Sequence, residues 1–132
     1  MPSRRIETMH ADPRRRFGNA AEGQAAQFME SQGYRIIGRN VRTRYGELDL
    51  VATQGGILVF CEVKARLSEG AGSPEEAISP AKQKKLAKLA AAFLWQHQEW
   101  SEAPCRFDAV FVRRDRQGWQ IKLLEDAFRP GW

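Results

Sequence analysis

Three residues that lie close together in the sequence, Asp49, Glu62 and Lys64, are of the types that hydrolyse phosphate esters. Two carboxylates that face each other repel unless a cation lies between them or they share a proton. Hard divalent cations favour carboxylate oxygens, and Mg²⁺ needs only one or two of them beside water and phosphate oxygens. Lys64 would share a strand face with Glu62, where it can hold an attacking water and offset phosphate charge. The combination predicts metal-assisted hydrolysis.

The elements that must position these residues follow from hydrophobic periodicity and turn signals. Ser79 followed by Pro80 is typical of a helix start, and Gly33 of a helix end. A loop is expected over residues 67–79 and a turn over residues 115–118. The predicted order is α-β-β-β-α-β-β, with helices at residues 17–32 and 80–98 and strands at residues 35–43, 46–53, 57–66, 106–113 and 119–124.

The two carboxylates face each other in only one register of the hairpin that Gln54-Gly55-Gly56 predicts. With both glycines at the centre of the turn, Asp49 lies opposite Glu62 and Glu47 opposite Lys64, with β-carbons about 5 Å apart. Moving the turn back by one residue would place Asp49 opposite Phe60. The first register is favoured because the strand face that holds Glu62 and Lys64 passes from apolar to charged residues, as a strand does when it enters a cleft.

Simpler interpretations of the charged residues remain open. A Glu-Val-Lys triplet also fits an exposed edge strand with cross-strand salt bridges. Lys82 precedes Leu86 by four residues and so shares the apolar face of its helix. It is aimed either at a site and its substrate or, by snorkelling, at the rim of the core. The segment from Ala77 to Gln98 holds four lysines and no acid, which suits a surface that follows phosphates.

Other titratable residues have mainly structural interpretations. Glu22 and Asn19 have the spacing of a capping box, although Glu22 also flanks the apolar face of the first helix. Asp108 is expected to be a buried partner of Arg106 or Arg66. Neither histidine, His10 or His97, has a partner at metal-ligand spacing.

Length and composition exclude several classes of protein. The chain has 132 residues, 42% of them hydrophobic and 28% charged, which fits one globular domain. Its longest apolar run, Leu89 to Trp95, is far shorter than the roughly 20 residues of a membrane span. No secretory signal is recognisable. Cys61 and Cys105 form no CxxC, so a zinc ribbon and a disulfide scaffold are excluded and a cytoplasmic location is expected.

The charge balance fits a polyanionic partner, although many soluble proteins are mildly basic. The chain carries 21 Lys and Arg against 16 Asp and Glu, a net charge of +5, and basic proteins attract nucleic acid, anionic membranes or acidic proteins. Residues 1–16 hold five arginines and few apolar residues, so we expect a basic, disordered tail ahead of a single domain over residues 17–132. That tail is either an arm for phosphates or an unstructured end.

The segments GELDL (46–50) and VFCEVKAR (59–66) resemble the YraN-like family of small bacterial proteins. That family is similar to the archaeal Holliday-junction resolvases and belongs with the PD-(D/E)xK nucleases. The resemblance covers about residues 17–125 and depends on several short pieces in a fixed order. The other pieces are Ala21-Glu22, Gly33-Tyr34, Arg39-Asn40, Ile78 with Lys82, and Arg106-Phe107-Asp108. Leu48 stands where the motif has a proline, a departure that the motif tolerates.

The resemblance implies a restriction-endonuclease-like α/β fold with a mixed five-stranded sheet flanked by helices. Asp49 matches the metal-binding Asp of the motif, Glu62 its second acid, Lys64 its lysine and Glu22 the helical acid that often completes the site. We therefore expect an endonuclease that uses Mg²⁺ or Mn²⁺ on DNA, including branched or structured DNA. The carbonyl of Val63 would be a further metal ligand, and the backbone phosphates would be contacted by Lys82, Arg39, Arg42, Arg44 and Arg66.

Two other functions compete with this interpretation. The first is a nucleic-acid-binding protein that keeps the nuclease fold without turnover. The second is a small adaptor with surface salt bridges, which would bind neither Mg²⁺ nor DNA. Symmetric cutting of a junction would need two sites, so function alone leaves a homodimer open.

Overall fold

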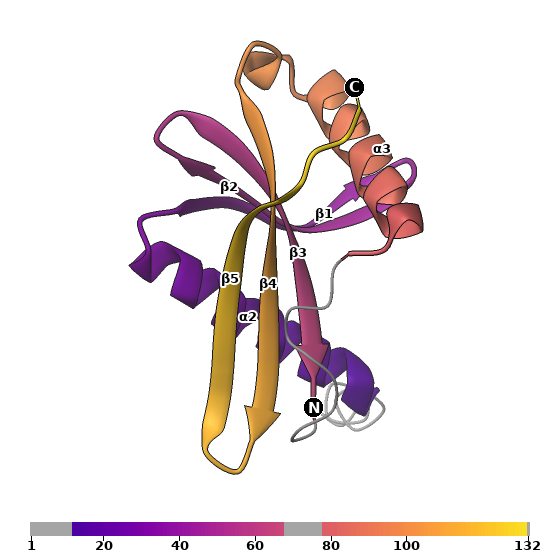
Figure 1. The fold of residues 1–132 in the computed structure, drawn as a ribbon. Helices are drawn as coiled ribbons and strands as arrows, with labels where there is room; N and C mark the ends of the chain where they lie inside the picture. Colours follow the sequence, from indigo (N-terminus) through magenta and orange to yellow (C-terminus); the bar gives the residue numbers. More distant parts are fainter. Residues whose placement is uncertain (1–11, 68–77, 132) are drawn as a thin grey trace, which may run out of the picture.

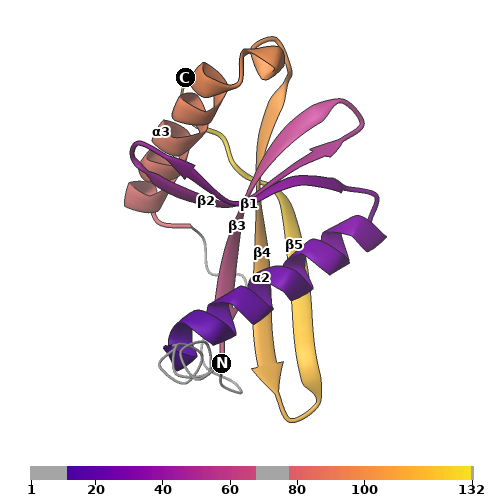
Figure 2. The ribbon, with the colours of Figure 1, turned by 180° about the vertical axis from the view of Figure 1, so that it is seen from behind.

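The protein is a five-stranded sheet with one long helix on each face (Figures 1 and 2). The computed structural model describes residues 12–67 and 78–131. The sheet order is β1-β2-β3-β4-β5; β3 and β4 are parallel and the other neighbours are antiparallel, as predicted for a mixed sheet. The elements are α2 (Pro13–Ser31), β1 (Arg35–Thr43), β2 (Gly46–Gln54), β3 (Ile57–Arg66), α3 (Pro80–Gln96), the 3-10 turn η1 (Gln98–Trp100), β4 (Cys105–Asp115) and β5 (Gly118–Phe128).

Each face of the sheet has its own hydrophobic core. Helix α2 packs small residues, Ala21 and Ala25 among them, against one face, with Val59 and Val110 from the central strands. On the other face, Leu86, Leu89 and Phe93 of α3 pack against Phe60. Small residues on α2 let the helix approach the sheet closely, whereas α3 fills its side with leucines and a phenylalanine. Both helices thereby cover the central strand β3, the strand that carries Glu62 and Lys64.

Several predicted boundaries were wrong. Helix α2 begins at Pro13 rather than at residue 17, because the Asp12 side chain accepts a hydrogen bond from the Arg14 backbone N–H (2.9 Å) and caps it. Asn19 therefore lies inside the helix, and the predicted capping box with Glu22 was wrong. Residues 13–16 are helical and not part of a tail; residues 1–11 lie outside the described part. Helix α3 ends at Gln96, and β4 and β5 are longer than predicted. Of the predicted loop over 67–79, residues 68–77 are also outside the described ranges.

The turn register on which the carboxylate pair depends was predicted correctly. Gln54 pairs with Ile57, and the β2–β3 ladder continues as far as Leu50 opposite Cys61. Beyond that pair β2 leaves β3, while its pairing with β1 continues to Thr43 opposite Gly46. The β1–β2 hairpin thus bends away from β3 and its tip lies beside α3 (Figures 1 and 2).

A local change of backbone conformation accompanies this separation. Leu48 and Val51 both belong to the core beneath α3, although regular strand alternation would put them on opposite faces. On the neighbouring strand, Asn40 has φ 50°, a left-handed conformation that non-glycine residues seldom adopt. Asp49 lies at this bend of β2. Within the described ranges, no helix is long and apolar enough to cross a membrane.

Candidate metal-binding and nuclease site

Asp49 and Glu62 meet where strands β2 and β3 part. Were the ladder to continue, the backbone of Val63 would pair with Leu48; instead its N–H donates to Asp49 Oδ2 at 2.9 Å. The Asp49 carboxylate thus takes the place of a backbone acceptor and is held against β3. The split between the strands keeps this acid beside Glu62, as the predicted register requires.

The pKa of Glu62 is raised, in part because Asp49 lies close to it. Burial raises this pKa, and the charge of Asp49 together with a hydrogen bond between the two side chains raises it further, to about 7. The Glu62 side chain is only 10% exposed. Near neutral pH the site therefore binds a proton, or an external cation, more readily than two ordinary carboxylates would.

Lys82 reaches the same site from the first turn of α3. Its Nζ lies 3.2 Å from Glu62 Oε2, and it lowers the Glu62 pKa against the effects of burial and Asp49. Ser79 caps the helix by accepting from the Lys82 N–H at 3.2 Å, which fixes the helix start. The structure thus places the Lys82 ammonium beside the Glu62 carboxylate.

Lys64 follows Glu62 by two residues on the same side of β3 and is half-buried. Its side chain makes no ion pair or hydrogen bond with any residue of the described ranges. Glu47 does not face it: the ladder has ended, and Glu47 pairs across β1–β2 with Arg42 at 2.9 Å. The predicted Glu47–Lys64 opposition was wrong because β2 turns towards α3 before reaching that position.

Glu22 approaches the pair from α2. Its pKa is raised, first by burial and then by the charge of Asp49, whereas a hydrogen bond from Asn40 and the charge of Arg39 lower it. Its Oε1 is buried without a hydrogen-bond partner. An unpartnered buried carboxylate oxygen next to another acid is a costly arrangement, and a cation would relieve it.

The three acids do not form a ready-made ligand shell. Among residues 12–67 and 78–131, no three His, Cys, Asp or Glu side chains converge at metal-binding distances. Asp49 and Glu62 form the close pair, and Glu22 lies within electrostatic reach of Asp49. Such a donor set suits a hard cation that keeps several waters, which is how Mg²⁺ is usually bound.

Asn40 is a site residue that sequence reasoning did not assign. Its left-handed backbone bends β1 opposite Asp49, and its side chain lowers the pKa of Glu22. Two signals were available: Arg39-Asn40 is one of the pieces of the family resemblance, and an Asn within a strand tolerates φ > 0 better than most residues. Arg39 precedes it and donates to the Asn19 carbonyl of α2 at 3.5 Å.

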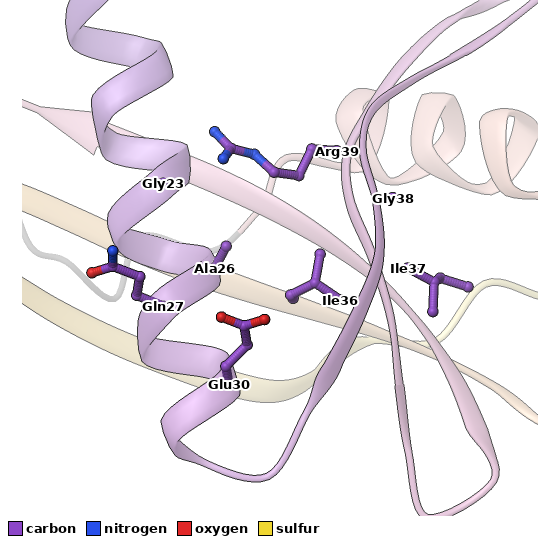
Figure 3. A pocket seen from close by; sticks show the side chains of 8 residues that line it. All are labelled: Gly23, Ala26, Gln27, Glu30, Ile36, Ile37, Gly38 and Arg39. Atoms are coloured by element: carbon purple, nitrogen blue, oxygen red, sulfur yellow. The ribbon is translucent and has the colours of Figure 1, made fainter.

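Arg39 also borders a groove of about 450 Å³ between α2 and β1 (Figure 3). Gly23 of α2 lines this groove (Figure 3). A Cβ at this position would lie 3.8 Å from the Arg39 guanidinium, which is an ordinary van der Waals distance. The groove lies beside the acidic site rather than at it. The other arginines expected to contact DNA, Arg42 and Arg44, extend from the β1–β2 hairpin, and Arg66 ends β3.

Asp108 has the structural role that was predicted. It is fully buried and binds Arg106 through both oxygens (2.8 and 2.9 Å), accepts from the Tyr34 hydroxyl at 2.8 Å and from the Asp126 N–H at 2.9 Å. These contacts join β4 and β5 to Tyr34, the residue that precedes β1. Cys61 and Cys105 are free thiols.

Comparison with known proteins identifies the family of this chain. Residues 21–112 match the Uncharacterised protein family UPF0102. A UPF0102 protein from Magnetococcus marinus is 50% identical over 88% of this chain and 94% of its own length. A UPF0102 protein from Symbiobacterium thermophilum is 48% identical over 86% and 97%.

A solved structure, that of Pyrococcus furiosus SfsA in complex with Ca²⁺, is similar to 81% of this chain with a TM-score of 0.43 and 19% identity. The match spans 63% of that protein. With 50% identity to a relative and a family match over most of its length, the chain belongs to family UPF0102, to which the GELDL and VFCEVKAR segments pointed.

Proposed function

We propose that this protein is a metal-dependent endonuclease that hydrolyses phosphodiester bonds in DNA, including branched or structured DNA. The observation that carries the proposal is the Asp49–Glu62 pair, held together by the Val63 N–H at the split between two strands. Burying two acids side by side raises the pKa of Glu62 and costs stability. A fold keeps such a cost where function requires it.

Mg²⁺ or Mn²⁺ fits this donor set. Asp49 and Glu62 would hold the ion. Glu22 and the carbonyl of Val63 would complete its ligand shell, either directly or through bound waters. The unpartnered Glu22 Oε1 supports this assignment. When bound, the ion supplies polarisation of the phosphate and a lower pKa for a bound water.

The two lysines have different tasks in this proposal. Lys64, which makes no ion pair with described residues, orients the attacking water and offsets charge on the phosphate. Lys82 holds the Glu62 carboxylate by their 3.2 Å ion pair and is available to a DNA phosphate once another cation takes its place. Arg39, Arg42, Arg44 and Arg66 contact backbone phosphates, which gives affinity with little sequence preference.

A non-catalytic DNA-binding protein is the second candidate. The surplus of basic residues favours it independently of the acidic pair. It predicts the same salt-dependent affinity for DNA, with log Kd changing by about 0.9 per phosphate contact for each tenfold change in salt. A flat salt titration would contradict both candidates.

Cleavage assays separate the two. Single-stranded, duplex, flap and four-way-junction DNA are incubated with the protein in Mg²⁺, Mn²⁺ or EDTA, and products are resolved on denaturing gels. Lys64→Ala is expected to abolish cutting while leaving DNA affinity within a few-fold, because one cation among many phosphate contacts adds little to binding. Loss of binding together with cutting would make Lys64 a docking residue, and absence of metal-dependent cutting on every substrate would leave the second candidate.

A further inference from the structure

The outer surface of α3 carries an exposed tryptophan beside a row of lysines. Lys84, Lys88, Ala91 and Trp95 recur at helical spacing on the side opposite the buried Leu86 and Leu89. All four are exposed. They form one stripe, about 16 Å long at 1.5 Å per residue, which is called the α3 stripe below.

Trp95 is the most exposed large hydrophobic residue described, at 80%. Among residues 12–67 and 78–131, no aromatic ring and no cation contacts its indole ring. A tryptophan gains stability by burial, and this one is left in solvent. Its ring faces are therefore available to a partner.

The tip of the β1–β2 hairpin extends this surface. Tyr45, at the tip, is 43% exposed, and its ring lies 4.2 Å from Lys88 Nζ and 5.6 Å from the guanidinium of Arg44. The contact is possible because Gly46, with φ 137°, lies close to α3, where a Cβ would already be 3.5 Å from Leu89. Both views show the tip beside the helix (Figures 1 and 2). Tyr45 is thus a positioning residue that gathers two cations next to the stripe.

Charge decides which partner fits. From Ser79 to Gln96 the chain has four lysines and no acid, so a second copy placing its own α3 stripe on this one would bring like charges together. Lysines on the same helix face as an exposed aromatic ring match a strand that offers phosphates and unpaired bases, since bases stack on aromatic side chains. A closed duplex presents no base face to Trp95.

We propose that the α3 stripe, with Tyr45 and Arg44, binds an unpaired DNA strand, one of whose bases stacks on Trp95. The proposal rests on the proposed function and narrows it to DNA with a single-stranded segment. Lys82, which binds Glu62 from the first turn of α3, lies on the opposite side of this helix, so the acidic site and the α3 stripe are separate surfaces of one element.

Binding measured in EDTA tests this without any cutting. The full chain is titrated into fluorescein-labelled oligothymidylate, and into a blunt duplex of the same length, by fluorescence anisotropy. Trp95→Ala should raise Kd for the single strand about five- to tenfold, the lower part of the range for one stacked base, and leave duplex affinity unchanged. Trp95→Phe should retain most of the affinity, and Leu124→Ala, another exposed apolar residue on β5, should match the parent.

The lysines provide a second readout. Lys84→Ala combined with Lys88→Ala should lower the slope of log affinity against log salt by about 0.7 for each lysine on a single strand. Arg14→Ala with Arg15→Ala, exposed on α2, is the matched control and should lower it less. Melting temperatures of all variants should stay close to that of the parent, because every changed side chain is largely or partly exposed and none belongs to a buried core.

Each outcome separates the two proposals. If Trp95→Ala binds oligothymidylate as the parent does, the stripe is not the strand-binding surface, whatever the cleavage assays show. If Trp95→Ala instead changes the oligomeric state, Trp95 belongs to an interface between copies and the proposal fails. If single-strand binding depends on Trp95 but no metal supports cutting, the stripe stands and the nuclease proposal fails.

Discussion

The clearest prediction concerns the dependence of stability on pH through Glu62. Its pKa rises from 4.5 to about 7 on folding, because of burial and Asp49. Between these values Glu62 binds more protons in the folded protein than in the unfolded chain, so the contribution of Glu62 to stability is fully present below about pH 4.5 and is lost as the pH rises through 7. At 1.36 kcal/mol per pKa unit, the metal-free protein should lose up to roughly 3 kcal/mol over this window.

Glu62→Gln removes the ionisation while keeping size and hydrogen-bonding capacity. In EDTA at pH 8 the variant should therefore be up to roughly 3 kcal/mol more stable than the parent, about 10 °C in melting temperature for a domain of this size. Near pH 4.5 the two proteins should melt alike. Urea unfolding followed by circular dichroism from pH 4 to 9 gives the free energy of unfolding directly.

A control variant distinguishes the effect of the Glu62 ionisation from the effect of removing any negative charge from the surface. Glu47→Gln lies on the same hairpin but is exposed and paired with Arg42, so its stability curve should run parallel to that of the parent. If Glu62→Gln kept the parental pH dependence, Glu62 would not carry the additional proton. The paired-carboxylate site would then lose its electrostatic basis.

Three further outcomes are expected. Asp49→Asn should melt at the same or a higher temperature than the parent in EDTA, because the Asn oxygen can still accept from Val63 while the charge repulsion disappears; Mg²⁺ should raise the melting temperature of the parent and barely change that of the variant. A variant far less stable than the parent would make Asp49 a structural partner. Lys82→Ala should move the pH transition upward, since Lys82 lowers the Glu62 pKa; an unmoved transition would contradict the role of the ion pair. Asp108→Ala should cost about 3–5 kcal/mol in urea unfolding by leaving the partly buried Arg106 guanidinium without its carboxylate partner, and a loss below 1 kcal/mol would contradict the structural role of Asp108.

Most of the fold could be predicted from local sequence signals. The register of the β2–β3 hairpin was predictable from the alternating apolar and polar residues of these strands and from the double glycine. Side-chain alternation and turn chemistry both depend on only a few neighbouring residues. The start of α2 was missed since the cap is Asp12, five residues before the apolar periodicity becomes clear. The 3-10 turn η1 was missed as well: three residues carry too little periodicity to be recognised.

The site was predictable where it depends on one hairpin and not where it depends on distant elements. The turn register predicts that Asp49 and Glu62 lie near each other, and the bond between the Asp49 side chain and the Val63 N–H holds them there after the ladder ends. Tertiary packing determines three other features of the site. These are the bend at Asn40, the pairing of Glu47 with β1 in place of β3, and the position of the hairpin tip beside α3. No spacing within β1 or β2 indicates where those strands will separate from β3.

The parallel pairing of β3 with β4 has a consequence for how the molecule folds. Strands β1 to β3 are joined by short turns, and so are β4 and β5, so both units can form from local contacts. Leu58 and Cys105, by contrast, must find each other across α3 and the whole β3–β4 connection. Joining distant segments is slow because the chain first loses loop entropy. We therefore expect the pairing of β3 with β4 to be the rate-limiting step of folding. The hairpin that carries Asp49 and Glu62 would form before this step, and Lys82 would reach Glu62 only when α3 packs on the sheet.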